Sequence, residues 1–194
     1  KLPYTPGDLL PIARVSNTVV GISVPVSLPA KSLKDVVEEA RARPGQMNCA
    51  GLTGALDIMF ESWLKSIGVD VKKVPYRNPV EAANDLAEGR IQLMMEAYAI
   101  VGPFVEAGKL KLLAVTSRER AAGAPNVPTA MEAGVPDLTI EGLVGFFGQR
   151  NLSSEAVDRI AGDVQKLLAD PTIVERLTAT GQVVNFGTAT EFGA

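Results

Sequence analysis

Residues 71–97 read VKKVPYRNPVEAANDLAEGRIQLMMEA and hold the pattern that decides the fold class. A short β-branched strand is expected at 71–74, and an apolar strand at 91–95. Between them, Asn78 and Pro79 predict the start of a helix, because Asn suits the N-cap and Pro the first helical position. A strand, a helix and a second strand in this order predict a parallel βαβ unit with a right-handed crossover.

The same alternation extends on both sides of this segment. Further strands are expected at 19–24, 47–50 and 110–115. Further helices are expected from Ser32, where Asp35 stands at capping-box spacing, after Gly54 and from Tyr98. Cys49 in its apolar strand and Trp63 on a helix stripe are expected in the core, as are Met47, Met94 and Met95. The order of these elements predicts an α/β fold with a parallel-rich sheet.

The last third of the chain has a different pattern. A short helix is expected at 129–133 and an extended segment at 138–147. After Gln149 only helices are expected, one capped by Ser153 or Ser154 and one that begins at Asp170.

The composition is that of a globular protein. The 194 residues are 46% apolar and 21% charged, with a net charge of −3 and a mean hydropathy of +0.16, whereas disorder needs low hydropathy with high net charge. No window of 18 consecutive apolar residues occurs, so we expect a protein that is not inserted in a membrane. The pI near 5.1 and the scattered lysines and arginines argue against a nucleic-acid partner.

Two features of the composition limit the chemistry. The chain has no His and a single cysteine, Cys49, which excludes Ser-His and Cys-His nucleophiles, a disulfide within the chain and a thiolate zinc cluster. The motifs GxSxG, GxGxxG, GxxxxGK and HExxH are absent. We therefore expect no catalytic residue, no metal and no cofactor. An enzyme on this fold would need a base, and Glu96 beside Tyr98 is the pair that could supply one.

Ligands of parallel α/β sheets bind beyond the carboxyl ends of the strands. Three segments lie there in the predicted fold, at 50–54, 75–78 and 95–98, and each leads into a helix. The first turn of a helix carries unpaired N–H groups and about half a positive charge, so several helix starts at one edge can bind an anion without a cationic side chain. The candidate ligand-binding residues are Ala50, Gly51, Leu52, Thr53, Tyr76, Arg77, Asn78, Glu96, Ala97 and Tyr98.

The side chains at this edge suggest distinct roles. The hydroxyls of Thr53 and Tyr76 are neutral donors, and Arg77 can clamp a carboxylate with two hydrogen bonds. Glu96 is the odd member, because a carboxylate at an anion site must pair with Arg77 or meet a donor on the ligand, such as an amine or a hydroxyl. Structural interpretations stay open beside these: Thr53 and Asn78 as helix N-caps, and Arg77 and Glu96 as solvated surface charges.

Six segments occur in an order that is typical of one protein family. They are KLPYTPGDLLPIARV, SLPAKSLKDVVEEARARPGQMN, VPYRN, DLAEGRIQLMM, AGKLKLLAVTS and APNVPTAMEAGVPDL. With LLADPTIVERL and GTATEF near the end, they extend over nearly the whole chain. The chain resembles the Bug family of extracytoplasmic solute receptors, the TctC-like substrate-binding proteins of tripartite tricarboxylate transporters.

This resemblance implies a type II periplasmic-binding-protein-like fold, with helices on both faces of the sheet and hinge closure of two lobes around the ligand. It implies a periplasmic protein that captures a small carboxylate (an organic acid) and delivers it to the membrane permease subunits of the transporter. Family ligands are held largely by backbone N–H groups, helix ends, hydroxyls and waters. Gly51 and Thr53 match the family's cleft loop, while Tyr76 and Arg77 match its VPY-Lys/Arg segment.

The chain also departs from the family pattern. It begins inside that pattern, so we expect a remnant of the first lobe or crossing segment at 1–15, a complete second lobe at 16–141 and a mainly helical return to a partial first lobe at 142–194. In the cleft, this chain has Leu52 where a small or polar residue is common in the family. It has Glu96 where many members have a neutral residue or Asp.

A regulator is the alternative to a receptor. The effector-binding domain of a LysR-type transcriptional regulator shares the fold and binds similar acids. An upstream DNA-binding helix-turn-helix would indicate the regulator, and an upstream signal peptide would indicate the receptor.

Overall fold

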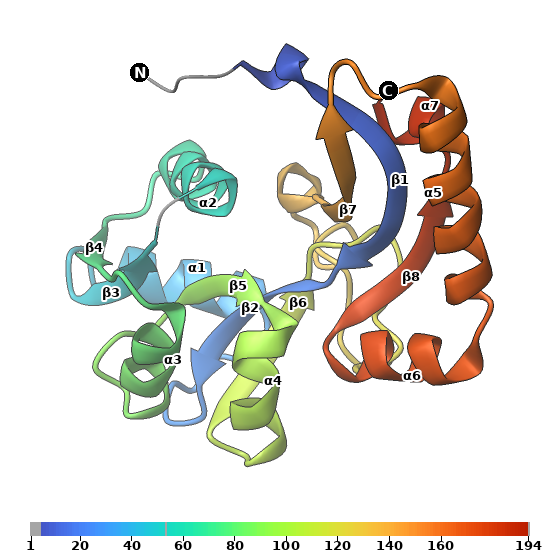
Figure 1. Ribbon diagram of the computed structural model, residues 1–194. Helices are drawn as coiled ribbons and strands as arrows, with labels where there is room; N and C mark the ends of the chain where they lie inside the picture. Colours follow the sequence, from blue (N-terminus) through green and yellow to red (C-terminus); the bar gives the residue numbers. More distant parts are fainter. Residues whose placement is uncertain (1–4, 53, 194) are drawn as a thin grey trace. The chain divides into compact units, whose positions relative to one another are not determined.

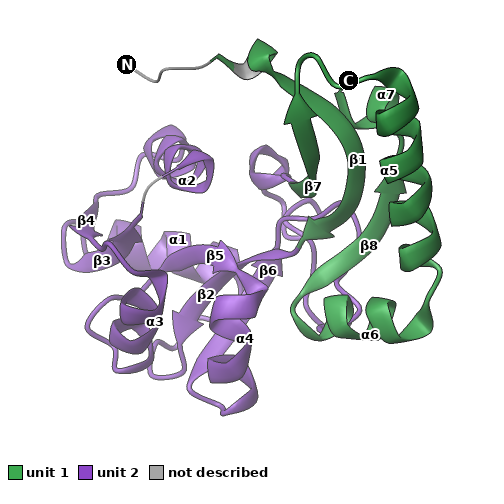
Figure 2. Cartoon of the chain, viewed as in Figure 1, with its two compact units in different colours: residues 1–18, 142–194 green, residues 19–141 purple. Residues whose placement is uncertain are grey.

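The computed structural model describes residues 5–52 and 54–193 and divides into two compact units (Figures 1 and 2). Unit 1 combines residues 1–18 with 142–194, and unit 2 is residues 19–141. The divisions therefore fall after Thr18 and after Glu141, whereas the family pattern placed them after residues 15 and 141.

The described residues of unit 2 form five strands, and an isolated bridge joins the β3–β4 ladder to the ladders of the other three strands. The strands are β2 (Val20–Pro25), β3 (Met47–Gly51), β4 (Val71–Pro75), β5 (Met94–Ala97) and β6 (Leu110–Val115). β3 pairs with β4 in parallel, β2 lies between β5 and β6, and a parallel bridge joins Cys49 to Leu93. The resulting order is β4-β3-β5-β2-β6, and the predicted α/β fold is confirmed, with a mixed sheet in which β3, β4, β5 and β6 run in one direction.

The direction of β2 differs from the prediction. The alternating pattern placed 19–24 among parallel βαβ units, but β2 is antiparallel to both β5 and β6. β1 (Leu9–Thr18) ends only two residues before β2 begins, so the chain enters unit 2 at the edge where the other four strands end. Hydrophobic periodicity reports which residues are buried but carries no information on strand direction.

Four helices cover the two faces of this sheet, as predicted. α1 (Leu33–Ala42) and α2 (Ala55–Ser66) bury Val36, Phe60 and Trp63 in one apolar cluster with the β2 residues Val20, Ile22 and Val24. α3 (Pro79–Ala87) and α4 (Tyr98–Glu106) pack on the other face, where Leu86 and Val101 share a cluster with Met94. Cys49, Trp63 and the methionines at 47, 94 and 95 are all buried, which confirms their assignment to the core.

The predicted helix starts are confirmed where the structure describes them. Ser32 and Asp35 form a complete capping box on α1. Asn78 Oδ1 accepts the Val80 N–H at 2.9 Å, with Pro79 as the first residue of α3. Thr53, interpreted as an N-cap, lies outside the described residues, and the N-cap position of α2 belongs to Gly54, whose φ of +109° suits glycine alone.

Unit 1 is built on a three-stranded antiparallel sheet. β1 lies between β7 (Gly142–Gln149) and β8 (Gln182–Gly187). α5 (Ser154–Leu168) buries Val157 and Val164 against Ile12 and Ala13 of β1. The other elements of this unit are η1 (Pro6–Asp8), α6 (Pro171–Ala179) and α7 (Ala189–Gly193).

Two predictions for the last third of the chain are wrong. The expected helix at 129–133 is a hydrogen-bonded turn, because Gly134 turns the chain with a φ of +80° and the Val135 N–H returns to the Ala130 carbonyl. A short helix, η2 (Pro136–Leu138), follows this turn, and the segment expected to be extended at 138–147 is extended as β7 from Gly142 onward. The expectation of helices alone after Gln149 missed β8, although its QVVNFG run carries the β-branched and aromatic residues of a strand.

Candidate functional site

The ends of four strands and the start of β2 meet at one edge of the unit 2 sheet. Gly51 is opposite Pro75, and Ala97 is opposite Val20. The Tyr76 N–H donates to the Gly51 carbonyl and the Tyr98 N–H to the Val19 carbonyl, both at 2.8 Å. The backbones of the predicted segments 50–52, 75–78 and 95–98 therefore line this edge; Thr53 lies outside the described residues.

Three helices begin at the same edge. Gly54 and Ala97, the N-cap residues of α2 and α4, make no side-chain capping bond, whereas Asn78 caps α3. Each helix start concentrates partial positive charge on its first N–H groups. Among residues 5–52 and 54–193, no capping side chain occupies the backbone donors that α2 and α4 present at this edge.

The Tyr76 side chain is not the free donor that the sequence suggested. Its ring packs with Leu52 and the buried Ala50 in the apolar cluster beneath α3. Its hydroxyl donates to Asp85 Oδ2 at 2.8 Å. Burial, reinforced by this hydrogen bond, raises the pKa of Tyr76 to about 12. A neutral phenol has one proton, so in this structure the hydroxyl can only accept a further hydrogen bond.

Tyr98 has a separate environment from Tyr76. Its ring packs in a cluster with Val19, Val115 and Ala121. Burial raises the pKa of Tyr98, and the nearby charge of Glu106 adds to this increase. For the Glu96–Tyr98 pair considered for an enzyme, the structure gives Glu96 a different partner, because Glu96 Oε1 accepts the Ala97 N–H.

Arg77 and Glu96 do not pair with each other. The Arg77 side chain is exposed, and no carboxylate within the described ranges lies within ion-pair distance of it. Glu96 is half-buried, and its Oε1 accepts the Ala97 N–H at 2.7 Å. Arg77 thus remains available to a ligand, while the Glu96 carboxylate is held at the start of α4.

The half-buried carboxylate of Glu96 predicts a pH-dependent stability. Burial raises the pKa of Glu96, while the Ala97 N–H partly offsets the increase. Between the ordinary and the raised pKa, the folded state binds more protons than the unfolded chain, so stability falls as the pH rises through that window. Glu96→Gln keeps an accepting oxygen and has no charge to bury. We expect its Tm to exceed that of the parent by more at pH 7 than at pH 4, as measured by calorimetry; an equal difference at both pH values would contradict this.

Asp57 and Lys73 lie beside this edge and were not among the predicted residues. Asp57 Oδ1 accepts the Leu52 N–H at 3.1 Å, and its Oδ2 accepts from Lys73 Nζ at 2.6 Å. Lys73 Nζ also lies 3.0 Å from Glu61 Oε2. The spacing of Gly54 and Asp57, an acid three residues after an N-cap, is the sequence signal that could have identified Asp57.

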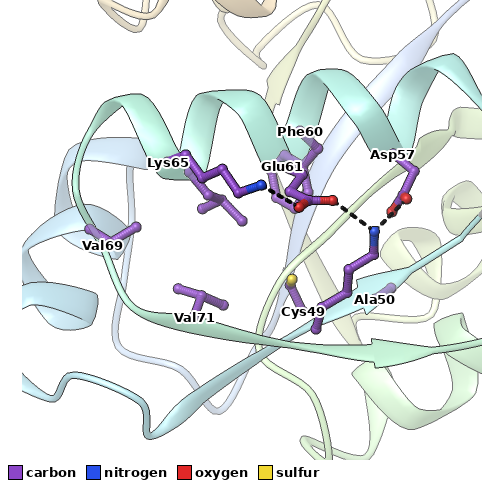
Figure 3. A pocket seen from close by; sticks show the side chains of 10 residues that line it. Cys49, Ala50, Asp57, Phe60, Glu61, Lys65, Val69 and Val71 are labelled. Carbon is purple, nitrogen blue, oxygen red and sulfur yellow. Dashed lines mark hydrogen bonds and ion pairs between the residues drawn. The ribbon is translucent and has the colours of Figure 1, made fainter.

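These charged residues border a pocket of about 140 Å³ between α2 and the β3–β4 ladder (Figure 3). Its floor is largely apolar and includes Phe60, Leu64 and Cys49. Burial raises the pKa of the Cys49 thiol to about 11, so the thiol is protonated at neutral pH. Of the predicted ligand residues that the structure describes, only Ala50 lines this pocket, which therefore differs from the edge itself.

Within the described part of the chain, no three acidic or cysteine side chains are grouped as a metal site would require. None of its helices has the length and apolar character needed to cross a bilayer.

Known proteins resemble this chain over almost its whole length. The family model described as tripartite tricarboxylate transporter family receptor (TctC) matches residues 1–191. A solved periplasmic transporter is 29% identical with a TM-score of 0.88, and the match covers 99% of this chain and 65% of that one. An R. palustris protein solved with adipate is 27% identical with a TM-score of 0.87, covering 100% and 66%.

A third structure, MatC from Rhodopseudomonas palustris with bound malate, is 26% identical with a TM-score of 0.77, and the match covers 95% of this chain and 64% of that one. The chain spans about half the length of the curated relatives that it matches, with 55%, 54% and 56% of the first three covered.

Proposed function

The chain belongs to the tripartite tricarboxylate transporter family of receptors, and from this membership we propose that it binds a small organic acid and delivers it to the permease subunits of such a transporter. We place this activity in the periplasm, where the family's receptors work. The family is one of solute-binding receptors rather than enzymes or DNA-binding regulators, which favours the receptor over the LysR-type alternative.

One observation carries the proposal: in the part of the chain that the structure describes, two helices without capping side chains and an arginine without an ion-pair partner come from segments at one sheet edge. α2 and α4 begin at Gly54 and Ala97 without side-chain caps, and Arg77 lies between them in the sequence with an exposed guanidinium. Backbone N–H groups at helix starts favour an anion, and a guanidinium fits a carboxylate with two parallel hydrogen bonds. These groups bind and orient a carboxylate without any change in its covalent structure.

A dicarboxylic acid is the ligand class that we favour. Two related structures contain adipate and malate, both of which carry two carboxylates. On this chain one carboxylate would meet Arg77 and the uncapped helix starts. Glu96 is held at the start of α4 by the Ala97 N–H, so a hydroxyl on the ligand, as in malate, would give that carboxylate a donor.

Calorimetric titration with adipate, malate and benzoate tests the proposal, with dimethyl adipate as an uncharged control. We expect saturable binding of at least one acid and none of the ester. A micromolar Kd corresponds to about −8 kcal/mol, which a few charge-assisted hydrogen bonds can supply. Absence of binding for all three acids, or equal binding of adipate and its ester, would overturn the proposal.

A further inference from the structure

Lys73 connects β4 to the segment that follows β3 through a continuous series of polar contacts. Its ammonium lies 2.6 Å from Asp57 Oδ2, and the other oxygen of Asp57 accepts the Leu52 N–H at 3.1 Å. Asp57 belongs to the first turn of α2, whereas Leu52 immediately follows the last residue of β3. The carboxylate thus joins the strand end, the helix start and the neighbouring strand.

The aliphatic part of Lys73 covers the same strand end. A Cβ added to Gly51 would come within 2.5 Å of Lys73 Cγ and 2.7 Å of its Cε. Glycine at position 51 therefore leaves the space through which the lysine side chain crosses from β4 towards α2. The methylene groups of Lys73 consequently pack over Gly51, while its ammonium holds Leu52 through Asp57.

The charge of Lys73 has a second consequence for the edge. The Asp57 side chain is only 14% exposed, so its carboxylate needs a counter-charge, and Lys73 provides one. Asp57 also adds negative charge at the start of α2, where we expect the ligand's carboxylate. Without Lys73, the Asp57 carboxylate would have no counter-charge from β4 and would repel the carboxylate of the ligand. The Asp57 side chain would also lose one of the contacts that fix its orientation.

We propose that Lys73 is a positioning residue for the carboxylate site: it neutralises and orients Asp57, which in turn holds the Leu52 peptide at the ligand-binding edge. The expected effect of Lys73 on ligand affinity rests on the proposed function. The linkage from Lys73 to the Leu52 N–H does not depend on the ligand and can be measured without it.

Lys73→Met and Lys65→Met form a matched pair of variants. Lys65 lies 2.7 Å from Glu61 and belongs to the same ion-pair network (dashed lines in Figure 3), but it pairs with Glu61 rather than Asp57. Both changes remove one positive charge and keep an unbranched apolar side chain. Lys73→Arg restores a cation that can pair with Asp57.

Amide hydrogen exchange, followed residue by residue by NMR, gives the first result. We expect the Leu52 amide to exchange about tenfold faster in Lys73→Met than in the parent, with the β2 amides unchanged as a check on the fold. Lys65→Met should leave Leu52 within twofold of the parent, and Lys73→Arg should restore most of its protection. Unchanged Leu52 exchange in Lys73→Met, or equal acceleration in Lys65→Met, would overturn the proposal.

Calorimetric titration of the same variants with adipate and malate gives the second result. We expect at least fivefold weaker binding in Lys73→Met, less than twofold weakening in Lys65→Met, and recovery in Lys73→Arg. Faster Leu52 exchange with unchanged affinity would refute the role of Lys73 in binding. If the parent binds none of adipate, malate and benzoate, the proposed function fails, and the exchange data alone decide whether Lys73 holds Leu52.

Discussion

Replacement of Trp63 by alanine is expected to lower the free energy of unfolding of unit 2 by about 3–5 kcal/mol. The indole is 4% exposed and stacks on Phe60 with ring centroids 5.7 Å apart. It lies in the cluster formed by α1, α2 and one face of the sheet. Its removal leaves a large apolar cavity that neighbouring side chains can fill only in part. Because native domains are stable by about 5–15 kcal/mol, much of the stability of unit 2 would be lost.

Urea denaturation followed by far-UV circular dichroism measures this change without relying on the removed fluorophore. Ile58→Ala on the same helix is the matched control, because Ile58 is 68% exposed and its truncation should cost less than about 0.5 kcal/mol. Similar losses for the two variants would contradict the packing described for α2.

Arg77→Ala is expected to weaken the binding of a dicarboxylate by about 10- to 100-fold. A charge-assisted hydrogen bond contributes about 1.5–3 kcal/mol, and a tenfold change in Kd corresponds to 1.4 kcal/mol. Arg77 follows the end of β4 and has no carboxylate partner within the described residues, so a bound ligand would be its counter-ion. Removal of the guanidinium would leave one ligand carboxylate with backbone donors alone.

Lys72→Ala is the matched control for Arg77→Ala. Lys72 is also exposed but lies inside β4, away from the carboxyl edge, and its loss changes the net charge equally. Calorimetric titration with adipate should give a Kd within twofold of the parent for Lys72→Ala. Equal weakening by the two changes would indicate long-range electrostatics instead of a contact at Arg77.

The fold of unit 2 could largely be predicted because its signals are local. The capping box of Ser32 and Asp35, and the Asn78-Pro79 helix start, depend on residues a few positions apart. The direction of β2 could not be predicted in this way, since it follows from how β1 leads into unit 2. The pairing of β1 with β7 and β8 joins residues more than 120 positions apart, beyond the reach of any local pattern.

The candidate site was predictable at the level of the backbone and less so for side chains. Strand order brings Gly51, Tyr76 and Ala97 to one edge, as the alternating pattern implied. The Tyr76 hydroxyl instead bonds to Asp85, because helix α3 returns over the ring. The link between Lys73 and Asp57 spans two elements, so only the packing of α2 on the β3–β4 ladder reveals it.

NMR titration of the ¹⁵N-labelled chain with adipate and malate tests the central claim most directly, because it reports the binding site residue by residue. We predict saturable shift changes at the amides of Leu52, Arg77 and Tyr98, which come from the three segments at the sheet edge. Saturable changes confined to the groove of about 400 Å³ formed by α1, α2 and residues 133–137, with those three amides unmoved, would contradict it.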